Sequence, residues 1–560
     1  MGRNIYLDNL PLDQAIEKWY SKLNLKAKIE QIDVREALGR KLARKVVAQT
    51  SSPHYPASAM DGIAVKSQLT AGASERNPIK LTQGEGYQLV DTGDPLPEEF
   101  DAVVMIEDVN IVDGLAQIER PAASGQHVRK VGESLIAGQL ILGEGEEITP
   151  HAMGLILEGN VKRVEVYVQP KVKIIPTGTE LVTDKEKLEP GDIIEFNSHV
   201  LSGLAKNWGA EPKRGNIVAD NYEKIRKKVI EAVAISDFVV ITAGSSAGRE
   251  DYTADIIEEL GEVIVHGVSI RPGGPTVLGV IADTPVMGVP GYPVASALAF
   301  RLFARELIYR LAGQKLPSSK KIKAKLSKKI VSDLGYKEFV RVKLAQFGEE
   351  LIATPLARSA GVLGSLVAAD GLLVSSEYSE GLESGQEVKV ELLTAKLEAD
   401  KSLLVAGSRD LALDLLKNRL KKEGVGLTFQ HLGSRGALTA LRRNEVQLAA
   451  IHFPVEGDYS KIKKFLGDKE VVGVNLGFCN KKISKEAKRK GINSLAPTDL
   501  LNAVEEGQIE LGLKLIIPKA YLEEPRIKKL LELIESEEFK AEMQEVGYQI
   551  SDGLDLDSNG

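Results

Sequence analysis

Three short apolar runs between residues 171 and 313 each end in a loop rich in glycine or proline, and a helical pattern follows each loop. The runs cover residues 171–176, 237–242 and 285–290, and the helical patterns cover 196–210, the residues up to Leu260, and 294–313. This alternation is typical of a mostly parallel sheet covered by helices. In such sheets ligands bind beyond the carboxyl ends of the strands, where these loops lie.

The chain has 560 residues and is too long for a single domain of about 100–200 residues. Its patterns predict a multi-domain α/β and β fold whose α/β domain covers residues 169–316. The other predicted parts are an N-terminal linker region (1–168) with a helix at 10–25 and an all-β insertion at about 50–147, a β-barrel or sandwich (317–398), and a second α/β part (401–560). The basic stretch 316–329 is expected to be a linker or an edge strand.

Composition excludes several classes of protein. Acidic residues exceed basic ones, 79 to 72, so the net charge of −7 disfavours a broad nucleic-acid surface. The single cysteine, Cys479, excludes an intramolecular disulfide and any CxxC site, and the seven histidines form no HxxxH or HxH pair for zinc. No apolar run reaches the roughly 18–20 residues that span a bilayer, and no signal-peptide pattern opens the chain. We therefore expect a cytoplasmic protein.

The loop AGSSAGREDY (243–252) carries the sharpest local signal. Its glycines and serines follow a buried strand and precede a helix, whose first backbone N–H groups are able to bind a phosphate. Asp251 is placed to hold Mg²⁺ or a ligand N–H group. The loop is no Walker A motif, since no Gly-Lys-Ser/Thr follows. A capped tight turn is the alternative interpretation.

Two loops of the N-terminal part carry carboxylates. In 51–65, two prolines hold an extended chain before Met60-Asp61-Gly62, and the Asp61 carboxylate suits a cation or a ribose hydroxyl. The local pattern by itself favours a simple turn there. The segment 92–108 ends in Glu107-Asp108, which offers oxygen ligands to Mg²⁺ or forms a solvated hairpin end.

Three further residues have a functional and a structural interpretation. Arg271, in the loop RPGGP, is able to pair with an anion, although a lone arginine is usually a surface residue. Ser408 and Ser434 each follow a strand and precede a helix, where hydroxyls and N–H groups bind tetrahedral oxyanions. Ordinary N-capping explains both serines equally well and is preferred.

Seven separated motifs, taken in order, resemble those of the molybdopterin molybdenumtransferase family (MoeA, or the gephyrin E-domain). They are SPHYPASAMDGIAV, TGDPLPEEFDAVVMIED, VRKVGES, PTGTEL, AGSSAGREDYT, RPGGP and GVPGYPVASA, and GLESGQEVKVELL resembles the last strands of that family. This resemblance covers about residues 5–396. Residues 401–560, with GSRDLALDLL and HLGSRGALTALRRNEVQLAAIHF, resemble the periplasmic-binding-protein-like (LysR-substrate-type) domains fused to such enzymes.

The first resemblance implies an elongated homodimer with a molybdopterin-binding α/β domain, an all-β insertion and a C-terminal β-barrel. It implies a transferase of molybdenum cofactor biosynthesis that joins molybdate, or tungstate, to the dithiolene of adenylylated molybdopterin, with Mg²⁺ and release of AMP. Cations and N–H groups must offset the repulsion between the two anions. The implied partners are these small molecules and a molybdopterin adenylyltransferase, with no nucleic acid and no membrane.

The resemblance also implies three sets of site residues. The catalytic set is Asp61, Glu180, Asp251, Arg271 and Arg341. The pterin- and nucleotide-binding set is Thr92, Thr177, Gly178, Gly244, Ser246, Gly248, Pro275, Pro290 and Gly291. The metal-binding set is Asp220 and Asp251.

Five positions depart from the motifs of the family, and they cluster at its molybdate end. An aspartate is replaced by Ser134, a lysine by Gly274, an asparagine by Tyr292, and serines by Ala295 and Ala360. Loss of a lysine at an anion site removes a charge-assisted contact of about 1.5–3 kcal/mol. We therefore expect altered metal insertion or a compensating residue. The alternative is a non-catalytic pterin or oxyanion sensor, or a scaffold.

The C-terminal part departs from its own resemblance as well. Few residues separate 471–478 from the strand 510–518, so most of a second lobe and its ligand loop are missing. Such a truncated domain is structural, or is a half-site that senses or delivers molybdate weakly. A role in nucleic-acid regulation has little support, because no helix-turn-helix precedes it.

Overall fold

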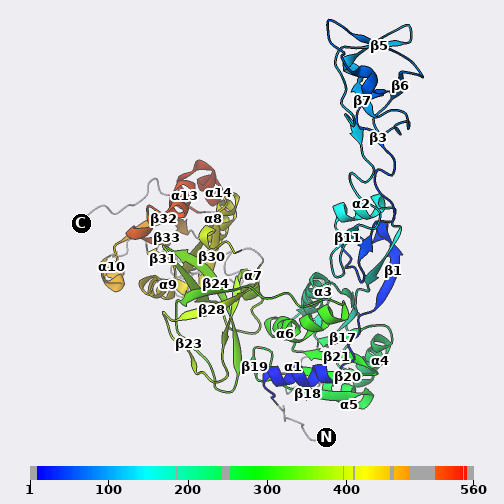
Figure 1. Cartoon of the computed structure of the whole chain (residues 1–560). Helices are drawn as coiled ribbons and strands as arrows, with labels where there is room; N and C mark the ends of the chain where they lie inside the picture. The colour runs from blue at the N-terminus through cyan, green and yellow to red at the C-terminus, as the bar shows by residue number, and fades with distance from the viewer. Residues whose placement is uncertain are drawn as a thin grey trace.

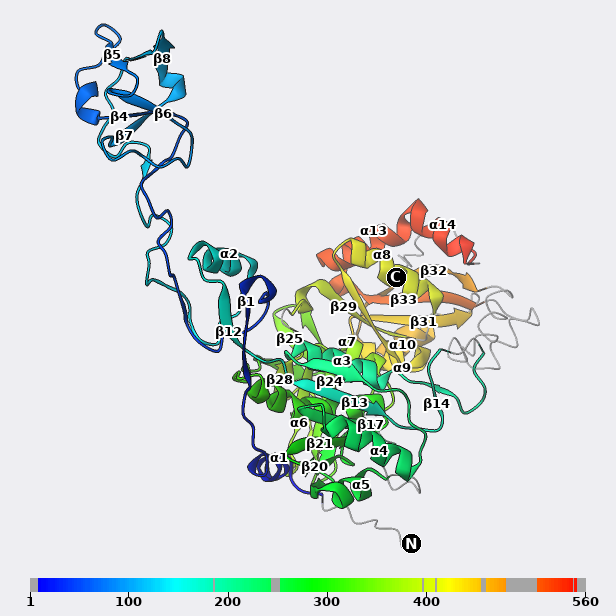
Figure 2. The ribbon, with the colours of Figure 1, turned by 90° about the vertical axis from the view of Figure 1, so that its right-hand side faces the viewer.

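The structure is a computed structural model that describes residues 9–184, 187–242, 252–394, 397–407, 410–454, 460–479, 511–546 and 548–550. It is elongated: a small β lobe stands at the end of a narrow arm, far from the α/β body, the barrel and the C-terminal unit (Figure 1). A view turned by 90° shows the same separation (Figure 2).

The central sheet has six strands in the order β16-β13-β17-β21-β20-β18. The first four are parallel, and β20 and β18 run antiparallel at one edge, so the expected mostly parallel sheet is confirmed. The strands are β13 (Lys171–Pro176), β16 (Glu211–Arg214), β17 (Phe238–Thr242), β18 (Glu262–His266), β20 (Val277–Ile281) and β21 (Thr284–Val289).

Helices bury both faces of this sheet. On one face α1 (Leu12–Ser21), α3 (Asn197–Asn207) and α6 (Pro293–Leu311) share a core with β13 and β17. On the other face the covering helices are α4 (Tyr222–Val233) and α5 (Thr253–Leu260). Trp19 of α1 is fully buried and its indole Nε1 donates to the Gly279 carbonyl at 3.0 Å, which fastens the first helix to β20.

The N-terminal part folds as an arm and a lobe. In the arm, β1 (Ile29–Asp33) pairs with β12 (Arg163–Tyr167), β2 (Val46–Val47) pairs with β11 (Leu140–Leu142), and α2 (Pro150–Glu158) packs against them. The lobe holds two three-stranded sheets and one short pair. Its strands are β3 (Ala57–Ser58), β4 (Gly62–Val65), β5 (Ile79–Thr82), β6 (Tyr87–Val90), β7 (Ala102–Met105), β8 (Val109–Val112), β9 (Leu115–Ile118) and β10 (Val128–Arg129).

The barrel is closed, because β24 pairs with both β25 and β26 and the remaining strands complete the ring. Its strands are β22 (Lys321–Leu326), β24 (Lys337–Phe347), β25 (Glu350–Pro355), β26 (Gly371–Ser375) and β28 (Glu387–Leu392), with β19 (Ile270–Arg271) added beside β24. The expectation of a linker or edge strand at 316–329 is wrong for β22, which pairs on both sides. Lysines alternate with its inward residues, Ala324 and Leu326, so the sequence of this segment shows no apolar run typical of a buried strand.

The C-terminal unit has a five-stranded sheet in the order β30-β29-β31-β33-β32, in which β29, β30 and β31 are parallel. Helices α8, α13 and α14 share the core of one face, and α9 and α10 cover the other. The elements are β29 (Ser402–Gly407), α8 (Leu411–Lys422), β30 (Gly426–His431), α9 (Gly433–Arg442), β31 (Leu448–Pro454), α10 (Ser460–Leu466), β32 (Val471–Cys479), β33 (Leu511–Pro518), α13 (Pro525–Glu535) and α14 (Glu537–Glu545).

The end of β24 joins the barrel to this unit. Ala345 is buried in the same core cluster as the α9 face of the C-terminal sheet. The Gln346 carbonyl accepts the Gln447 amide and the Arg526 guanidinium, each at 3.2 Å, and the Phe347 and Tyr521 rings meet edge to face. The two units therefore share a packed, hydrogen-bonded contact.

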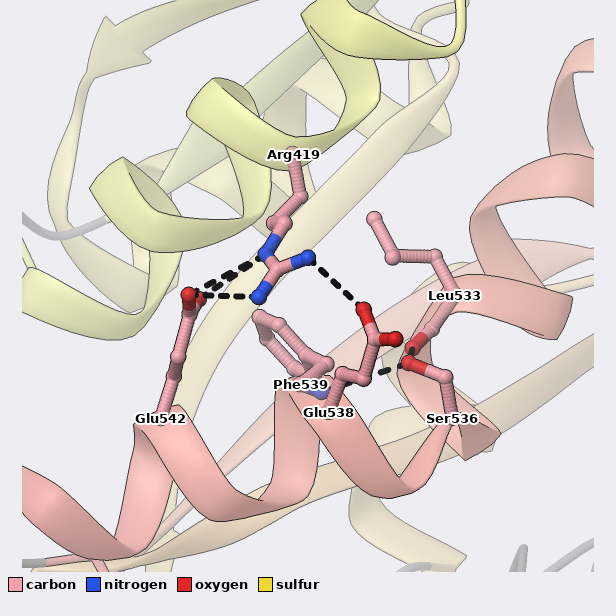
Figure 3. A network of polar contacts seen from close by, with 6 residues as sticks. All are labelled: Arg419, Leu533, Ser536, Glu538, Phe539 and Glu542. Atoms are coloured by element: carbon pink, nitrogen blue, oxygen red, sulfur yellow. Dashed lines mark hydrogen bonds and ion pairs between the residues drawn. The ribbon is translucent and has the colours of Figure 1, made fainter.

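Arg419 of α8 links that helix to α14 in the C-terminal unit (Figure 3). It donates to both oxygens of Glu542 and, at 2.9 Å, to Glu538. The hydrogen bonds from Arg419 lower the pKa of Glu542 below its ordinary value of 4.5. A lowered carboxyl pKa stabilises the fold above the unfolded value, and this contribution is lost as the pH falls through the folded pKa.

We predict that Glu542→Gln weakens the packing of α8 on α14 at neutral pH, and that this effect diminishes as the pH falls below 4.5 through the lowered folded pKa, because the wild-type carboxylate becomes protonated over that range. Hydrogen exchange of α8 and α14, corrected for the pH dependence of the intrinsic rates, measures this. Glu537→Gln, which leaves Arg419 untouched, is the matched control. An equal loss of protection at all pH values would contradict the prediction.

Candidate functional site

A cavity of about 730 Å³ opens at the carboxyl edge of the central sheet. Thr177 and Glu180 follow β13, Thr242 ends β17, and Pro290 and Gly291 follow β21. The cavity thus lies where the parallel topology predicts a ligand site. The other walls are formed by the segment that leads into α3, by the loop that follows β19, and by residues before and within the barrel. Their residues are Ile193, Ile194, Glu195, Phe196, Asn197, Arg271, Pro272, Gly273, Gly274, Pro275, Tyr336 and Ala360.

The loop after β13 is held by backbone and hydroxyl contacts. The Thr177 hydroxyl donates to the Thr242 carbonyl at 3.0 Å and is buried. The Gly178 N–H donates to the Val218 carbonyl at 3.0 Å, and a Cβ at Gly178 would approach Leu181 Cγ to 2.7 Å. Glycine is therefore required for this path of the chain, although Gly178 itself does not line the cavity.

Arg271 is the one basic side chain on the described part of the cavity wall. Its guanidinium forms an ion pair with Asp333 and lies 4.2 Å from the centre of the Tyr336 ring. Both contacts hold the guanidinium at the cavity and offset part of its charge. The remaining described walls are neutral or apolar, apart from Glu180 and Glu195.

Four of the five departures from the family motifs lie on this cavity: Gly274, Tyr292, Ala295 and Ala360. Ser296, the serine one place after Ala295, is buried, and its hydroxyl has no hydrogen-bond partner among the described residues. It does not line the cavity. Ser134 belongs to the arm, where its hydroxyl and that of Ser52 lower the pKa of Glu158.

Arg341 of β24 is buried between the barrel strand and the loop and helix of residues 357–365, and it does not line the cavity. Its guanidinium donates to Ser365 Oγ at 3.1 Å and to the carbonyls of Ala357 and Ser359. Burial, together with the nearby Arg358, lowers its pKa. Arg341 therefore fixes the loop 357–360, whose last carbonyl, on Ala360, accepts the Val294 N–H of α6 at 2.9 Å.

Asp61 and Thr92 are brought together, but in the lobe. Asp61 Oδ1 accepts the Thr92 N–H at 2.6 Å and its hydroxyl at 2.7 Å, and these bonds lower the pKa of Asp61. Asp61 directly precedes β4, and the lobe that holds β4 stands far from the central-sheet strands β13, β17 and β21 (Figure 2). Within one chain, Asp61 and Glu180 do not share a site.

The predicted metal residues are only partly described. Asp220 Oδ2 accepts the Thr179 N–H at 2.8 Å, next to Glu180, whereas Asp251, Gly244, Ser246 and Gly248 lie outside the described residues. In the described ranges, no three His, Cys, Asp or Glu side chains are grouped as for a metal ion.

Comparison with known proteins identifies the body of the chain. Family models match at residues 10–158 (MoeA N-terminal region, domain I and II), 173–310 (probable molybdopterin binding domain) and 323–393 (MoeA C-terminal region, domain IV). A Methanocaldococcus jannaschii protein named for molybdopterin biosynthesis is 37% identical over 404 residues, which are 69% of this chain and 98% of that protein. The chain belongs to the MoeA family.

Two further members of the MoeA family support the match. The molybdopterin molybdenumtransferase of Bacillus subtilis is 30% identical over 69% of this chain and 94% of its own length. The crystal structure of a MoeA protein for molybdopterin biosynthesis from Pyrococcus horikoshii superposes with a TM-score of 0.57 at 32% identity, over 69% of this chain and all of that one. The expected enzyme of molybdenum cofactor biosynthesis, a molybdopterin molybdenumtransferase, is thereby confirmed.

Sequence reasoning missed several residues of the cavity wall. Phe196 was part of an expected helix, and Tyr336 stands alone before β24. A lone aromatic residue is more often a core residue than a ligand contact, so no local signal marks either one. Only the fold brings them beside the motif residues.

We predict that Arg341→Ala disorders the loop 357–360, because the carbonyls of Ala357 and Ser359 lose their hydrogen bonds to a charged donor, which are worth about 1.5–3 kcal/mol. Hydrogen exchange should increase in this loop and in the first turn of α6, which the Ala360 carbonyl contacts. Arg341→Lys is the conservative comparison, and it should rescue little, since an ammonium cannot reproduce the planar fork. Unchanged exchange in Arg341→Ala would contradict the positioning role.

Proposed function

We propose that this MoeA-family protein inserts molybdate, or tungstate, into adenylylated molybdopterin with release of AMP, in the cavity at the carboxyl edge of the central sheet. The cavity is the observation that supports this proposal. Most of its wall comes from the segment matched by the molybdopterin-binding model, including Thr177, Glu180, Pro275, Pro290 and Gly291. The sequence motifs assign all five to the site.

The walls suit the proposed substrate. Ile193, Ile194 and Phe196 form an apolar side, on which a flat heterocycle gains contact area. Arg271 offers a fixed guanidinium to an oxyanion or phosphate oxygen. Its prior pairing with Asp333 means that it stabilises an incoming anion less than a free cation would. Altered handling of molybdate follows from this single, already paired cation and from Gly274.

Mg²⁺ is the proposed metal, and the described carboxylates fit it. Mg²⁺ usually takes one or two carboxylates together with substrate phosphates and water. Glu180, exposed on the cavity, and Asp220, bonded to the adjacent Thr179, are the described candidates, and Asp251 completes the predicted set. When bound, Mg²⁺ neutralises phosphate charge, while Glu180 and Asp220 position it.

A homodimer would unite the separated parts of the predicted site. The Asp61–Thr92 pair belongs to the lobe, which stands far from the central sheet of its own chain (Figure 1). A second copy that places its lobe over this cavity would supply the carboxylate that the motifs assign to catalysis. We therefore include in the proposal a cytoplasmic homodimer that receives its substrate from a molybdopterin adenylyltransferase. No helix in the described ranges is long and apolar enough to cross a membrane.

For residues 401–560 we propose a truncated periplasmic-binding-protein-like domain. The parallel order of β30, β29 and β31, with α8 and α9 on opposite faces, supports one lobe of such a fold. Ser434 lies at the strand ends, where its hydroxyl accepts the His452 N–H at 3.0 Å, and Ser408 lies outside the described residues. The family models matched to the chain end at residue 393.

The proposed reaction is tested by incubating the purified full chain with adenylylated molybdopterin, Mg²⁺ and molybdate, and measuring AMP. We expect release that requires molybdate and that stops on chelation of Mg²⁺. Glu180→Gln should raise the Mg²⁺ concentration for half-maximal release about tenfold, by loss of one metal ligand. No release above the molybdate-free background would contradict the proposal.

We predict that Gly274→Lys lowers the molybdate concentration needed for half-maximal AMP release about tenfold, because a charge-assisted contact is worth about 1.5–3 kcal/mol. A Cβ at Gly274 would lie 3.2 Å from the Ile270 carbonyl and 3.3 Å from the Val268 carbonyl, so Gly274→Ala controls for crowding. If both variants behave alike, the missing lysine does not limit the reaction.

A further inference from the structure

A second, larger cavity of about 1330 Å³ runs between the barrel and the C-terminal unit. One wall is the whole of β30 with its flanking residues, 424–432. The facing wall is the barrel loop from Pro355 through α7 (Gly364–Ala368). Because β24 is packed and hydrogen-bonded to the C-terminal unit, the two walls are held at a fixed separation. We call this cavity the β30 groove.

β30 is the open edge strand of its sheet. In the described ranges it pairs with β29 alone. The Leu432 N–H donates to the Gly407 carbonyl of β29 at 3.0 Å. By the two-residue alternation of a parallel ladder, the N–H and C=O groups of Leu427 and Phe429 then point away from β29, toward the groove. An edge of this kind is a template for another extended chain.

Gln430 gives an independent sign of a missing ligand. Gln430 is 6% exposed and lines the groove, and its side-chain Nε2 has no hydrogen-bond partner among the described residues. A buried amide donor left unpaired costs free energy. A chain lying along β30 would provide a carbonyl or carboxylate acceptor for it.

The charged residues of the groove indicate the charge of the ligand that it would bind. Seven of its lining residues are lysines or arginines, and two, Glu398 and Asp414, are acidic. Lys417 and Lys421 lie one turn apart on α8, both are exposed, and neither has a carboxylate partner in the part of the chain that the structure describes. Four of the other basic residues are paired with carboxylates, so the excess positive charge of the groove is concentrated at Lys417 and Lys421, within a chain whose net charge is −7.

The facing wall adds apolar contacts. Val367 of α7 is 84% exposed and Val362 is 42% exposed, and both line the groove. Alternate side chains of an extended strand point to opposite sides. A ligand strand along β30 would therefore place some side chains against these valines and others toward the lysines.

We propose that the β30 groove binds an extended acidic peptide segment of a partner protein, which adds to β30 as a further strand. A peptide backbone matches the alternating donors and acceptors of Leu427 and Phe429. A phosphodiester chain offers acceptors only and would face the outward carbonyls unpaired. A peptide partner is therefore favoured over a nucleic acid.

The test uses the full chain and a fluorescein-labelled synthetic peptide of about ten residues that alternates glutamate and valine, long enough to cover β30 at roughly 3.3 Å per residue. Fluorescence anisotropy should show saturable binding of one peptide per chain. Lys417→Glu with Lys421→Glu should weaken binding about tenfold or more, since like charges then face the peptide. Lys463→Glu with Lys464→Glu, on the exposed face of α10, is the matched charge control and should bind normally.

A backbone control separates strand addition from charge attraction. The same peptide with alternate amides N-methylated keeps its charges but cannot pair with a strand edge, and we expect it to bind at least tenfold more weakly. Equal binding of the N-methylated peptide, or displacement of the plain peptide by oligothymidylate at equal charge concentration, would overturn the proposal in favour of a general polyanion site. Absence of saturable binding would overturn it as well.

Discussion

The whole body depends on burial of both faces of the central parallel sheet. Such a sheet is stable only when helices cover both sides, and here one cover includes α1, from the very start of the described chain. Trp19, Phe238 and Phe303 pack ring against ring in that core. With both faces filled, the carboxyl edge is the remaining open side, and the loops that line the first cavity are gathered there.

Charge is distributed unevenly over this frame. The cavity at the sheet edge has one described basic side chain, Arg271, already paired with Asp333. Lysines and arginines gather instead in the β30 groove, which is lined by the same barrel loop that reaches the first cavity at Ala360. The chemistry proposed for the first cavity therefore depends on its shape, its backbone groups and a bound metal, whereas recognition proposed for the β30 groove combines the strand edge with side-chain charge.

Much of the fold could be predicted from the sequence, for identifiable reasons. The runs that become β13, β17 and β21 are apolar, short and ended by glycine or proline, so their observed bounds lie within a residue or so of the expected ones. The segment of β22 was expected to be a linker or an edge strand because its outward residues are lysines, and β16 was missed because Glu211–Arg214 contains no apolar pattern. The cavity motifs were found because they lie in loops after strands. Arg341 was assigned to the site from its motif, whereas its observed contacts are with a neighbouring loop.

The end of β24 has a practical consequence for anyone who dissects this protein. Ala345 is 1% exposed and belongs to the core of the C-terminal unit, and the Gln346 carbonyl is satisfied from that unit as well. A fragment that ends after the barrel would expose Ala345 and would leave the Gln346 carbonyl without these donors. Exposed apolar surface beside an unpaired strand end favours self-association and poor solubility. The C-terminal unit thus covers an apolar, hydrogen-bonding strand end of the barrel.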